Sequence, residues 1–535
     1  MEPHMLHNIK KIKEVLVPFT DEDNEGLSDD ETAAPETMIV GPTGGIPVPP
    51  PLPPRRPSSR TPSADTPRQT MAEQRSGEAP PPRLKRDDAA YAAAAAADAL
   101  RGDVDRRDPR TEAEGRAAMK AYKEAWEQAN ADHKDRPITS ENPAGEHEYP
   151  TLLTLASVSW YVHGWKVLPE IPLYKLETTP IEGGNLNYAW RCGPSDDPSI
   201  SVFVKQAPAY IRCLGPEYPL TNLRAQVEAN ALKALRAICP NNAPEVLVYD
   251  DYRCAMILED LRDFRLLRDD LLRGMVDETV AEGLGRFCAE VYDATHDKDD
   301  AYFTNIFGDD DNGAMRAITR DYVFTKPFRA DATNRTLDEE SGLGFRVANA
   351  RADAGLLAAV KRANAAFDDA HDCLSHGDLH AGSVMVGNER TVAIDAEFAC
   401  RGPAGLDVAF LIAGYLFAFC AADARALDAE AAGIRRVSCG DAIRALWRAY
   451  GETRHAGALA FADVSGFLGC ELLRRVLGAA SVPDLAEISD PIQKERAELL
   501  AVEVGVGVLV DAPETVELLV AFAEGCYDSL ALDKY

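Results

Sequence analysis

A stretch of 28 residues in the second half of the chain gathers the residue types needed for phosphoryl transfer. It runs from 371 to 398 and reads HDCLSHGDLHAGSVMVGNERTVAIDAEF, with three of the chain's ten histidines in its first ten residues. The pattern predicts a loop that carries Asp378, followed by a hairpin over residues 384–394 whose turn lies at 387–390. An acid on such a loop could orient the hydroxyl group of a substrate.

Two further acids, Asp395 and Glu397, follow the hairpin. Because a hairpin returns the chain to the edge where it began, Asp395 should lie beside the loop that carries Asp378. Strand alternation should turn Asp395 and Glu397 to one side. Carboxylates that converge repel one another unless a cation lies between them, and oxygen ligands favour Mg²⁺. The segment therefore predicts a magnesium-dependent phosphotransferase site, with Asp378 left to face the substrate hydroxyl.

Each part of this segment also has an ordinary explanation. The string His376-Gly377-Asp378 is short, and acids on a surface hairpin are usually only solvated. We expect His376 and His380 to orient the loop through hydrogen bonds rather than to bind zinc. The functional interpretation is favoured because an H-x-D-x-x-x-x-S loop, a hairpin and an acidic strand end occur in the order that kinase-like phosphotransferases need.

The preceding region predicts the elements of a nucleotide site. Residues 200–205 (ISVFVK) alternate as a strand does, residues 223–238 carry the apolar stripe of a helix, and residues 254–260 (CAMILED) form a second apolar strand. Lys205 could contact the α- and β-phosphates of a nucleotide. Glu228 on the helix could orient Lys205, as in the lysine–glutamate pair of protein kinases.

Two backbone segments could complete that site. The turn GGNLNYAW at 183–190 could bring N–H groups close to phosphates, although an ordinary hairpin is the better interpretation of this turn alone. The stretch MILEDL at 256–261 has the character of a hinge between lobes, where backbone groups would read adenine. The candidate nucleotide contacts in the two segments are Gly183, Gly184, Asn185, Asn187, Glu259 and Leu261.

The composition excludes several classes of protein. The 535 residues include 57 Lys and Arg against 87 Asp and Glu, a net charge of −30, so we expect no binding to nucleic acid or to an anionic membrane surface. Eleven cysteines without a CxxC pair predict free thiols in a reducing compartment. The longest apolar run, residues 408–422, is too short for a membrane span and predicts a buried core helix. With no signal-like segment at the start, we expect a cytoplasmic protein.

Composition changes near residue 147. Residues 1–147 are rich in Pro, Arg and acids, which predicts a largely disordered extension with room for short helices. Its PLPPRRP segment (51–57) could dock in a proline-recognition groove, but a solvated linker is favoured. For the rest we expect an α+β fold of two lobes with a cleft between them, a β-rich lobe at 148–262 and a helical lobe at 263–535.

Taken together, these segments resemble the 5-methylthioribose kinases, small-molecule kinases with a protein-kinase-like fold. The resemblance is collinear over about residues 148–535 and is strong in HGDLHAGSVMVGNERTVAIDAEFACRGPAGLDVAFLIAGYLFAF (376–419). It extends to GGNLNYAWR (183–191) and to LLRRVLGAASVPDLAEI (472–488), which is similar to the family's twin-arginine segment. Ser383 distinguishes the chain from aminoglycoside and choline kinases, which usually carry asparagine there.

The resemblance implies a role for each matching residue. Asp378 would be the catalytic aspartate that faces the 1-hydroxyl of methylthioribose, and Asp395 and Glu397 would hold Mg²⁺ with ATP. Lys205 would contact the ATP phosphates beneath the loop at 183–187. Contacts to the sugar or to the transferred phosphoryl group would come from Tyr218, Arg474 and Arg475. The resemblance also leaves room for a homodimer.

The chain departs from the family pattern at four positions. Ala396 replaces the proline of D-P-E, Ala381 replaces the threonine of H-T-G-S, Tyr218 stands for a tryptophan near the substrate lid, and Arg401 replaces an aromatic residue. None of these changes removes a charge that the chemistry requires. They do put substrate selectivity in question, because pocket shape decides which alcohol fits.

Three alternatives stay open on the sequence. The enzyme could phosphorylate another alcohol, namely choline, homoserine, an aminoglycoside or a different pentose. The chain could also be a catalytically silent kinase fold that serves as a scaffold through its proline-rich tail. Without the resemblance, Arg474 and Arg475 would be interpreted as an exposed pair on a helix surface.

Overall fold

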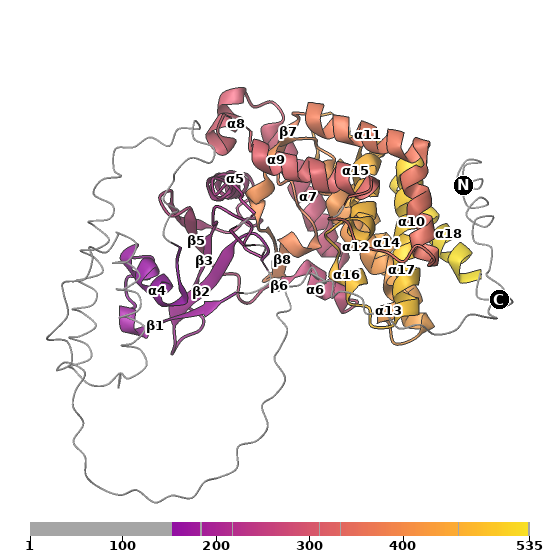
Figure 1. Ribbon diagram of the computed structural model, residues 1–535. Helices are drawn as coiled ribbons and strands as arrows, with labels where there is room; N and C mark the ends of the chain where they lie inside the picture. Colours follow the sequence, from indigo (N-terminus) through magenta and orange to yellow (C-terminus); the bar gives the residue numbers. More distant parts are fainter. Residues whose placement is uncertain are drawn as a thin grey trace, which may run out of the picture. The chain divides into compact units, whose positions relative to one another are not determined.

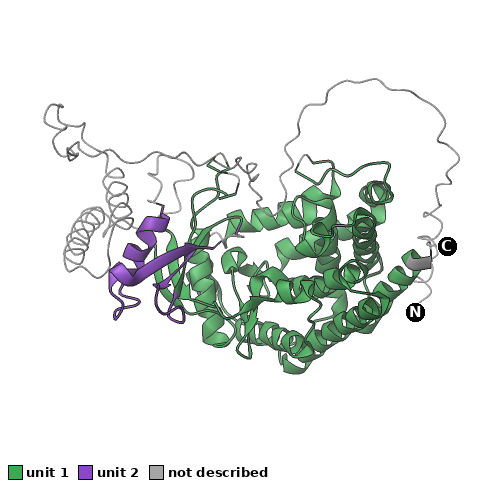
Figure 2. Cartoon of the chain, turned by 90° about the horizontal axis from the view of Figure 1, so that it is seen from below, with its two compact units in different colours: residues 1–38, 185–189, 202–535 green, residues 39–184, 190–201 purple. Residues whose placement is uncertain are grey.

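The computed structural model describes residues 152–532 except residues 182, 183, 214, 217, 310, 332 and 458 (Figure 1). The predictions for the extension at 1–147 lie outside the described residues. The described chain forms two compact units, coloured separately in Figure 2. The smaller unit holds residues 152–184 and 190–201, and the larger unit holds residues 185–189 and 202–532. The lobe boundaries at 148–262 and 263–535 stay predictions.

The smaller unit consists of a helix and an antiparallel strand pair. Helix α4 (Leu155–Gly164) begins with a capping box, in which the Thr154 side chain accepts a hydrogen bond from the Ser157 N–H. It packs against β1 (Leu176–Pro180), which pairs with β2 (Tyr188–Pro194). The first two residues of β2 belong to the larger unit. The strand expected after the glycine turn is therefore present.

Three antiparallel strands of the larger unit carry the first predicted site residues. They are β3 (Val202–Gln206), β4 (Val246–Asp250) and β5 (Ala255–Glu259), and β5 pairs with both of the others. Helix α5 (Arg224–Ile238) packs against β4 and β5. The predicted strands at 200–205 and 254–260 and the predicted helix at 223–238 are confirmed to within two residues at each end.

The hairpin predicted over residues 384–394 is confirmed. Strands β8 (Val384–Gly387) and β9 (Arg390–Ala393) pair antiparallel, and β6 (Arg265–Leu266) pairs with β8. Asn388 and Glu389 both have positive φ, 50° and 58°. A two-residue turn of this kind matches the twist of a hairpin. A separate pair, β7 (Cys373–Ser375) and β10 (Cys400–Gly402), flanks the loop that carries Asp378.

The apolar run predicted as a core helix forms α12 (Leu406–Cys420), and every residue of this helix except Asp407 is buried. It packs against α14 (Ala429–Thr453), α15 (Phe461–Leu477) and α17 (Pro491–Asp511). Figure 1 shows these helices together. Full burial of each Leu, Ile or Phe contributes about 1.5–3 kcal/mol. Within the described part of the chain, no helix is long and apolar enough to cross a membrane.

The remaining elements are further helices and short turns of helix. The longer helices are α7 (Glu278–Thr295), α8 (Asp300–Phe307), α9 (Gly313–Thr319), α10 (Gly342–Ala352), α11 (Ala354–Asp369) and α18 (Val516–Leu532). The short ones are η1 (Leu173–Lys175), α6 (Leu267–Leu272), η2 (Arg320–Thr325), η3 (Lys326–Phe328), η4 (Ala381–Ser383), η5 (Ala396–Phe398), α13 (Ala422–Arg425) and α16 (Pro483–Ala486). The antiparallel strands together with the many helices confirm the predicted α+β class.

Candidate active site

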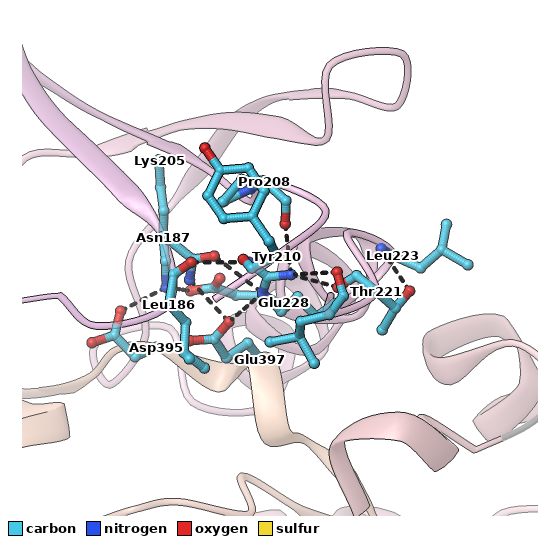
Figure 3. Close-up of polar contacts among 12 residues, drawn as sticks. Leu186, Asn187, Lys205, Pro208, Tyr210, Thr221, Leu223, Glu228, Asp395 and Glu397 are labelled. Carbon is cyan, nitrogen blue, oxygen red and sulfur yellow. Dashed lines mark hydrogen bonds and ion pairs between the residues drawn. The ribbon is translucent and has the colours of Figure 1, made fainter. Parts of the chain in front are cut away.

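Lys205 joins three elements of the larger unit. It lies on β3 with its side chain buried, and its Nζ donates to Glu228 Oε1 on α5 and to Asp395 Oδ1 after β9, both at 2.7 Å (Figure 3). Burial disfavours the charged form of the lysine, but Asp395 and Glu228 outweigh this effect and raise the pKa of Lys205. The lysine is therefore charged, and it holds two acids that lie far apart in the sequence.

Strand alternation, the predicted reason for placing Asp395 and Glu397 on one side, does not apply to these residues. Strand β9 ends at Ala393, and Asp395 adopts a left-handed backbone conformation with φ 62° and ψ 44°. The turn η5 follows directly. Aspartate tolerates this conformation better than most residues. The two carboxylates consequently meet different cations, because Asp395 pairs with Lys205 whereas Glu397 pairs with Arg224.

Each of these carboxylates has a cation of the protein beside it. Glu397 is buried, and its Oε2 accepts hydrogen bonds from Asn187 Nδ2 at 2.9 Å and from Arg224 Nε at 3.2 Å. Lys205 occupies the corresponding place between Glu228 and Asp395. These cations do not cancel the repulsion fully, because burial and then the nearby Glu397 and Asp395 still raise the pKa of Glu228 despite its contact with Lys205. The side chain of Asp395 is 50% exposed, so its carboxylate is accessible to a ligand.

Asp378 lies in a cationic setting on the loop before η4. His380 Nε2 is 3.5 Å from Asp378 Oδ2, and Arg474 Nη2 is 3.4 Å from Asp378 Oδ1. Burial by itself would raise the pKa of Asp378, but His380 and then Arg474 and Arg475 hold it well below its usual range. Asp378 is therefore ionised near neutral pH and can act as a hydrogen-bond acceptor.

The two loop histidines make the hydrogen bonds expected of them. Asp378 N–H points at His376 Nδ1 at 3.4 Å, so His376 carries its proton on Nε2 and donates it to Ile394 O at 2.8 Å. His380 Nδ1 accepts a hydrogen bond from the Gly382 N–H at 2.9 Å. This leaves the protonated Nε2 of His380 facing Asp378.

Asp407, the acidic residue in the first turn of α12, holds the backbone of the loop that carries Asp378. Its carboxylate accepts hydrogen bonds from the backbone N–H groups of His376 and Gly377, at 2.7 and 3.0 Å. Gly377 has φ +84°, and a Cβ there would lie 2.2 Å from Phe398 O, so no other residue fits. Asp407 therefore sets the backbone immediately before Asp378.

Replacing Asp407 with alanine should lower kcat about 100-fold, because a catalytic group displaced by about 1 Å loses that much rate. The two N–H groups would also lose their acceptor, so we expect a lower melting temperature. Steady-state kinetics and thermal unfolding would measure both effects. The matched control is Asp463→Ala, which removes an exposed first-turn acid from the neighbouring helix α15. Equal kcat values for the two variants would contradict this function of Asp407.

Arg474 and Arg475 are not an exposed surface pair, so that interpretation is wrong. Both lie on α15 and are only 8% exposed. The buried Glu471 carboxylate accepts from both guanidinium groups, from Arg475 Nε at 2.6 Å and from Arg474 Nε. The spacings of three and four residues bring these side chains together on one helix face. Arg474 then extends from this pair to Asp378.

The other residues predicted to contact the nucleotide do not join the cluster around Lys205. Gly183 lies outside the described residues, Gly184 belongs to the smaller unit, and the Asn185 carbonyl accepts from the Cys213 N–H at 3.0 Å. The Glu259 carboxylate binds Arg390 and Arg236, and its backbone N–H donates to Glu245 O at 2.9 Å. Leu261 is buried, and Tyr218 is 52% exposed.

Sequence reasoning overlooked three residues that hold this site together. They are Arg224, Asp407 and Glu471. Asp407 opens an otherwise apolar helix, and Glu471 precedes the arginine pair at helical spacing. Both patterns were visible in the sequence. No local signal links Arg224 to Glu397, which lies 173 residues away.

The sequence of this chain is similar to those of known phosphotransferases. Residues 177–452 match the phosphotransferase enzyme family. The chain is 33% identical over 380 residues to a methylthioribose kinase of Citrobacter koseri, a match that covers 65% of this chain and 92% of the relative. It is 34% identical over 364 residues to a methylthioribose kinase of Cronobacter sakazakii, covering 62% of this chain and 88% of the relative.

Solved structures of similar fold are more distant. An ethanolamine kinase of Plasmodium vivax matches with a TM-score of 0.37 and 11% identity, covering 76% of this chain and 96% of the other. A choline kinase of Cryptosporidium parvum matches with a TM-score of 0.38 and 12% identity, covering 66% of this chain and 94% of the other. These two similarities bear no weight in the assignment of an activity.

Proposed function

The chain belongs to the phosphotransferase enzyme family and, within it, to the methylthioribose kinases, and from that premise we propose that it transfers the γ-phosphoryl group of ATP to the 1-hydroxyl of 5-methylthioribose. The product would be 5-methylthioribose 1-phosphate, in methionine salvage. One observation carries the proposal for this chain: an ionised Asp378 lies 3.4 Å from Arg474 of a buried arginine pair. Transfer would be direct, since the motif offers no nucleophile of its own.

The nucleotide half of the site would be built around Lys205. Oriented by Glu228, Lys205 would pair with phosphate oxygens of ATP. Asp395 and Glu397 would hold the Mg²⁺ that accompanies ATP, and bound Mg²⁺ would neutralise charge on the phosphates. Within the described residues, no group of three His, Cys, Asp or Glu side chains forms a complete metal site. Two carboxylates fit Mg²⁺ well, because this ion keeps waters and phosphate oxygens as ligands.

The acceptor half would use Asp378 and the arginine pair. Asp378 would accept a hydrogen bond, and then the proton, from the attacking hydroxyl group. Arg474 and Arg475 would stabilise charge on the transferred phosphoryl group, since planar guanidinium groups match its oxygens. Glu471 and the ionised Asp378 together balance the charge of the two arginines. The net charge of this cluster therefore does not distinguish a neutral sugar from a cationic alcohol, and the choice between them rests on the acceptors tested below.

Three of the four departures from the family pattern differ in their structural setting. Arg401 is occupied outside this site, because it pairs with Asp300 at 2.7 Å and lies over the Phe303 ring. Ala381 lies against Gly414 of α12, where a Cβ on the glycine would be 3.1 Å away. Tyr218 is half exposed and is the departure best able to alter which alcohol fits.

Release of ADP by the purified protein tests the proposal. With Mg²⁺ and ATP, the acceptors would be methylthioribose, ribose, choline, homoserine and an aminoglycoside, each at the same concentration. We expect turnover with methylthioribose at least 100-fold above the other acceptors, as expected when a site rejects substrates that leave its polar groups unpaired. Turnover with another acceptor would keep the phosphotransferase assignment and overturn the substrate. No turnover with any acceptor, despite binding of Mg-ATP, would favour a silent scaffold.

A further inference from the structure

Arg224 is the most completely enclosed charged side chain near the site, with an exposed fraction of 0%. It is the first residue of α5, and its guanidinium group contacts four separate segments of the larger unit. Nε donates to Asn187 Oδ1 and to Glu397 Oε2, both at 3.2 Å. Its terminal nitrogens donate to the carbonyl groups of Leu186, Pro208, Tyr210 and Thr221.

The contacts among Arg224, Asn187 and Glu397 form a closed triangle. The Asn187 amide accepts from Arg224 through its oxygen and donates to Glu397 through its nitrogen, at 2.9 Å. Both donors act on Oε2 of Glu397. The orientation of the carboxylate is therefore fixed at one oxygen, and Oε1 is the oxygen available to a metal ion.

Stability alone gives a poor reason for such an arrangement. Burial lowers the pKa of Arg224, and Glu397 and Glu228 counteract this effect, so the group stays charged at a substantial desolvation penalty. Buried ion pairs often stabilise a protein no better than apolar residues of similar size. What the triangle does provide is a fixed distance between the backbone at 186–187 and the carboxylate of Glu397.

We propose that Arg224 is a positioning residue that couples the backbone at Leu186 and Asn187 to the metal-binding carboxylate of Glu397. This inference rests on the proposed function, because it takes Glu397 as a ligand of the Mg²⁺ that accompanies ATP. Because of this coupling, the Glu397 carboxylate is placed correctly only when the segment at 186–187 is ordered, and the reverse also holds. Loss of Arg224 should therefore weaken the contribution of Mg²⁺ to nucleotide binding more than it weakens binding of the nucleotide itself.

The test is the ratio of the ATP dissociation constants without and with Mg²⁺, measured by calorimetry on the full chain without acceptor. For Arg224→Gln we expect this ratio to fall at least tenfold from the wild-type value, since removal of a partner of a metal ligand typically costs 10- to 100-fold in metal affinity. The dissociation constant in EDTA should change less than threefold. A wild-type ratio in Arg224→Gln, with only the melting temperature lowered, would overturn the proposal.

A second variant covers the case in which Arg224→Gln fails to fold. Asn187→Ala keeps the buried arginine and removes one side of the triangle, so the ratio should fall about threefold to tenfold. Because the ratio compares one variant with itself, any direct contact of Asn187 with ATP cancels. An unchanged ratio in this variant would likewise overturn the proposal.

Arg253→Gln is the matched control, because Arg253 is a buried arginine in the turn between β4 and β5 and pairs with the buried Asp250 at 3.2 Å. It should lose stability and keep the wild-type ratio, and a matching fall in this control would overturn the specific coupling. Failure of the proposed function would look different. Wild-type protein that binds no ATP, or binds it equally well with and without Mg²⁺, would refute both, whereas turnover of another alcohol would leave the coupling intact.

Discussion

Replacing Asp378 with asparagine should lower kcat by about three orders of magnitude, within the range of 10²- to 10⁴-fold typical of positioned proton acceptors. The change keeps the size and shape of the side chain, so His380 and Arg474 keep a neighbour at 3.5 and 3.4 Å. What is lost is the negative charge. An amide oxygen can accept a hydrogen bond from a substrate hydroxyl, but it cannot take the proton at neutral pH.

The measurement is kcat from ADP release, combined with the dissociation constant for Mg-ATP. Nucleotide affinity should change less than threefold, because Lys205, Asp395 and Glu397 are untouched. Asp372→Asn is the matched control, since this exposed aspartate precedes the same loop and its carboxylate only accepts a hydrogen bond from the Ala404 N–H. We expect the control to keep wild-type turnover. Near-normal turnover in Asp378→Asn would show that Asp378 does not accept the proton of the substrate hydroxyl.

Local patterns predicted most of the fold elements around the site. The hairpin at 384–394 was visible because Asn388 supports positive φ in a tight turn, and the turn residues Asn388 and Glu389 both adopt it. The core helix over 408–422 could be predicted because a long continuous run of apolar residues is stable only when it is buried in the core. Period-two and period-3.6 spacing likewise revealed β3 and α5. Each of these signals lies within about 15 residues of sequence, which is why one sequence was enough.

The partners of buried charges could not be predicted in the same way. Three carboxylates suggested a cation, and the structure supplies Lys205 and Arg224. These contacts span 190 residues for Lys205 with Asp395 and 173 residues for Arg224 with Glu397. The spacing of apolar residues along the sequence does not indicate such pairs, because they form only when separate elements pack together. The left-handed residue at Asp395 was missed for a related reason, since alternation holds only while the strand continues.

The arginine pair shows how a general tendency fails at a functional site. Charged helix residues are usually exposed, so Arg474 and Arg475 taken alone predicted a surface pair. Both are instead buried around Glu471, which precedes them by three and four residues. A glutamate at that spacing within an otherwise apolar helix face was the available clue. The contribution of Glu471 to the free energy of unfolding can be measured by mutation.

Replacing Glu471 with leucine should lower the free energy of unfolding by about 3–5 kcal/mol, the usual penalty for removing one partner of a buried ion pair. The loss should be large because the change leaves two cations, each 8% exposed, without their common acceptor. Arg474 would keep the longer contact to Asp378 at 3.4 Å and its place over the Phe410 ring. Chemical unfolding monitored by circular dichroism would give the free energy.

Glu498→Leu is the informative control for this prediction. Glu498 is also buried, with an exposed fraction of 2%, and accepts two hydrogen bonds from Arg335, at 2.6 and 2.9 Å, but the side chain of Arg335 is 31% exposed. Because water can solvate Arg335 once its partner is gone, this variant should lose only about 1–2 kcal/mol. If burial of the abandoned arginines decides the penalty, Glu471→Leu must be the more destabilised variant. Equal losses in the two variants would mean that the buried glutamate, rather than its partners, sets the energy.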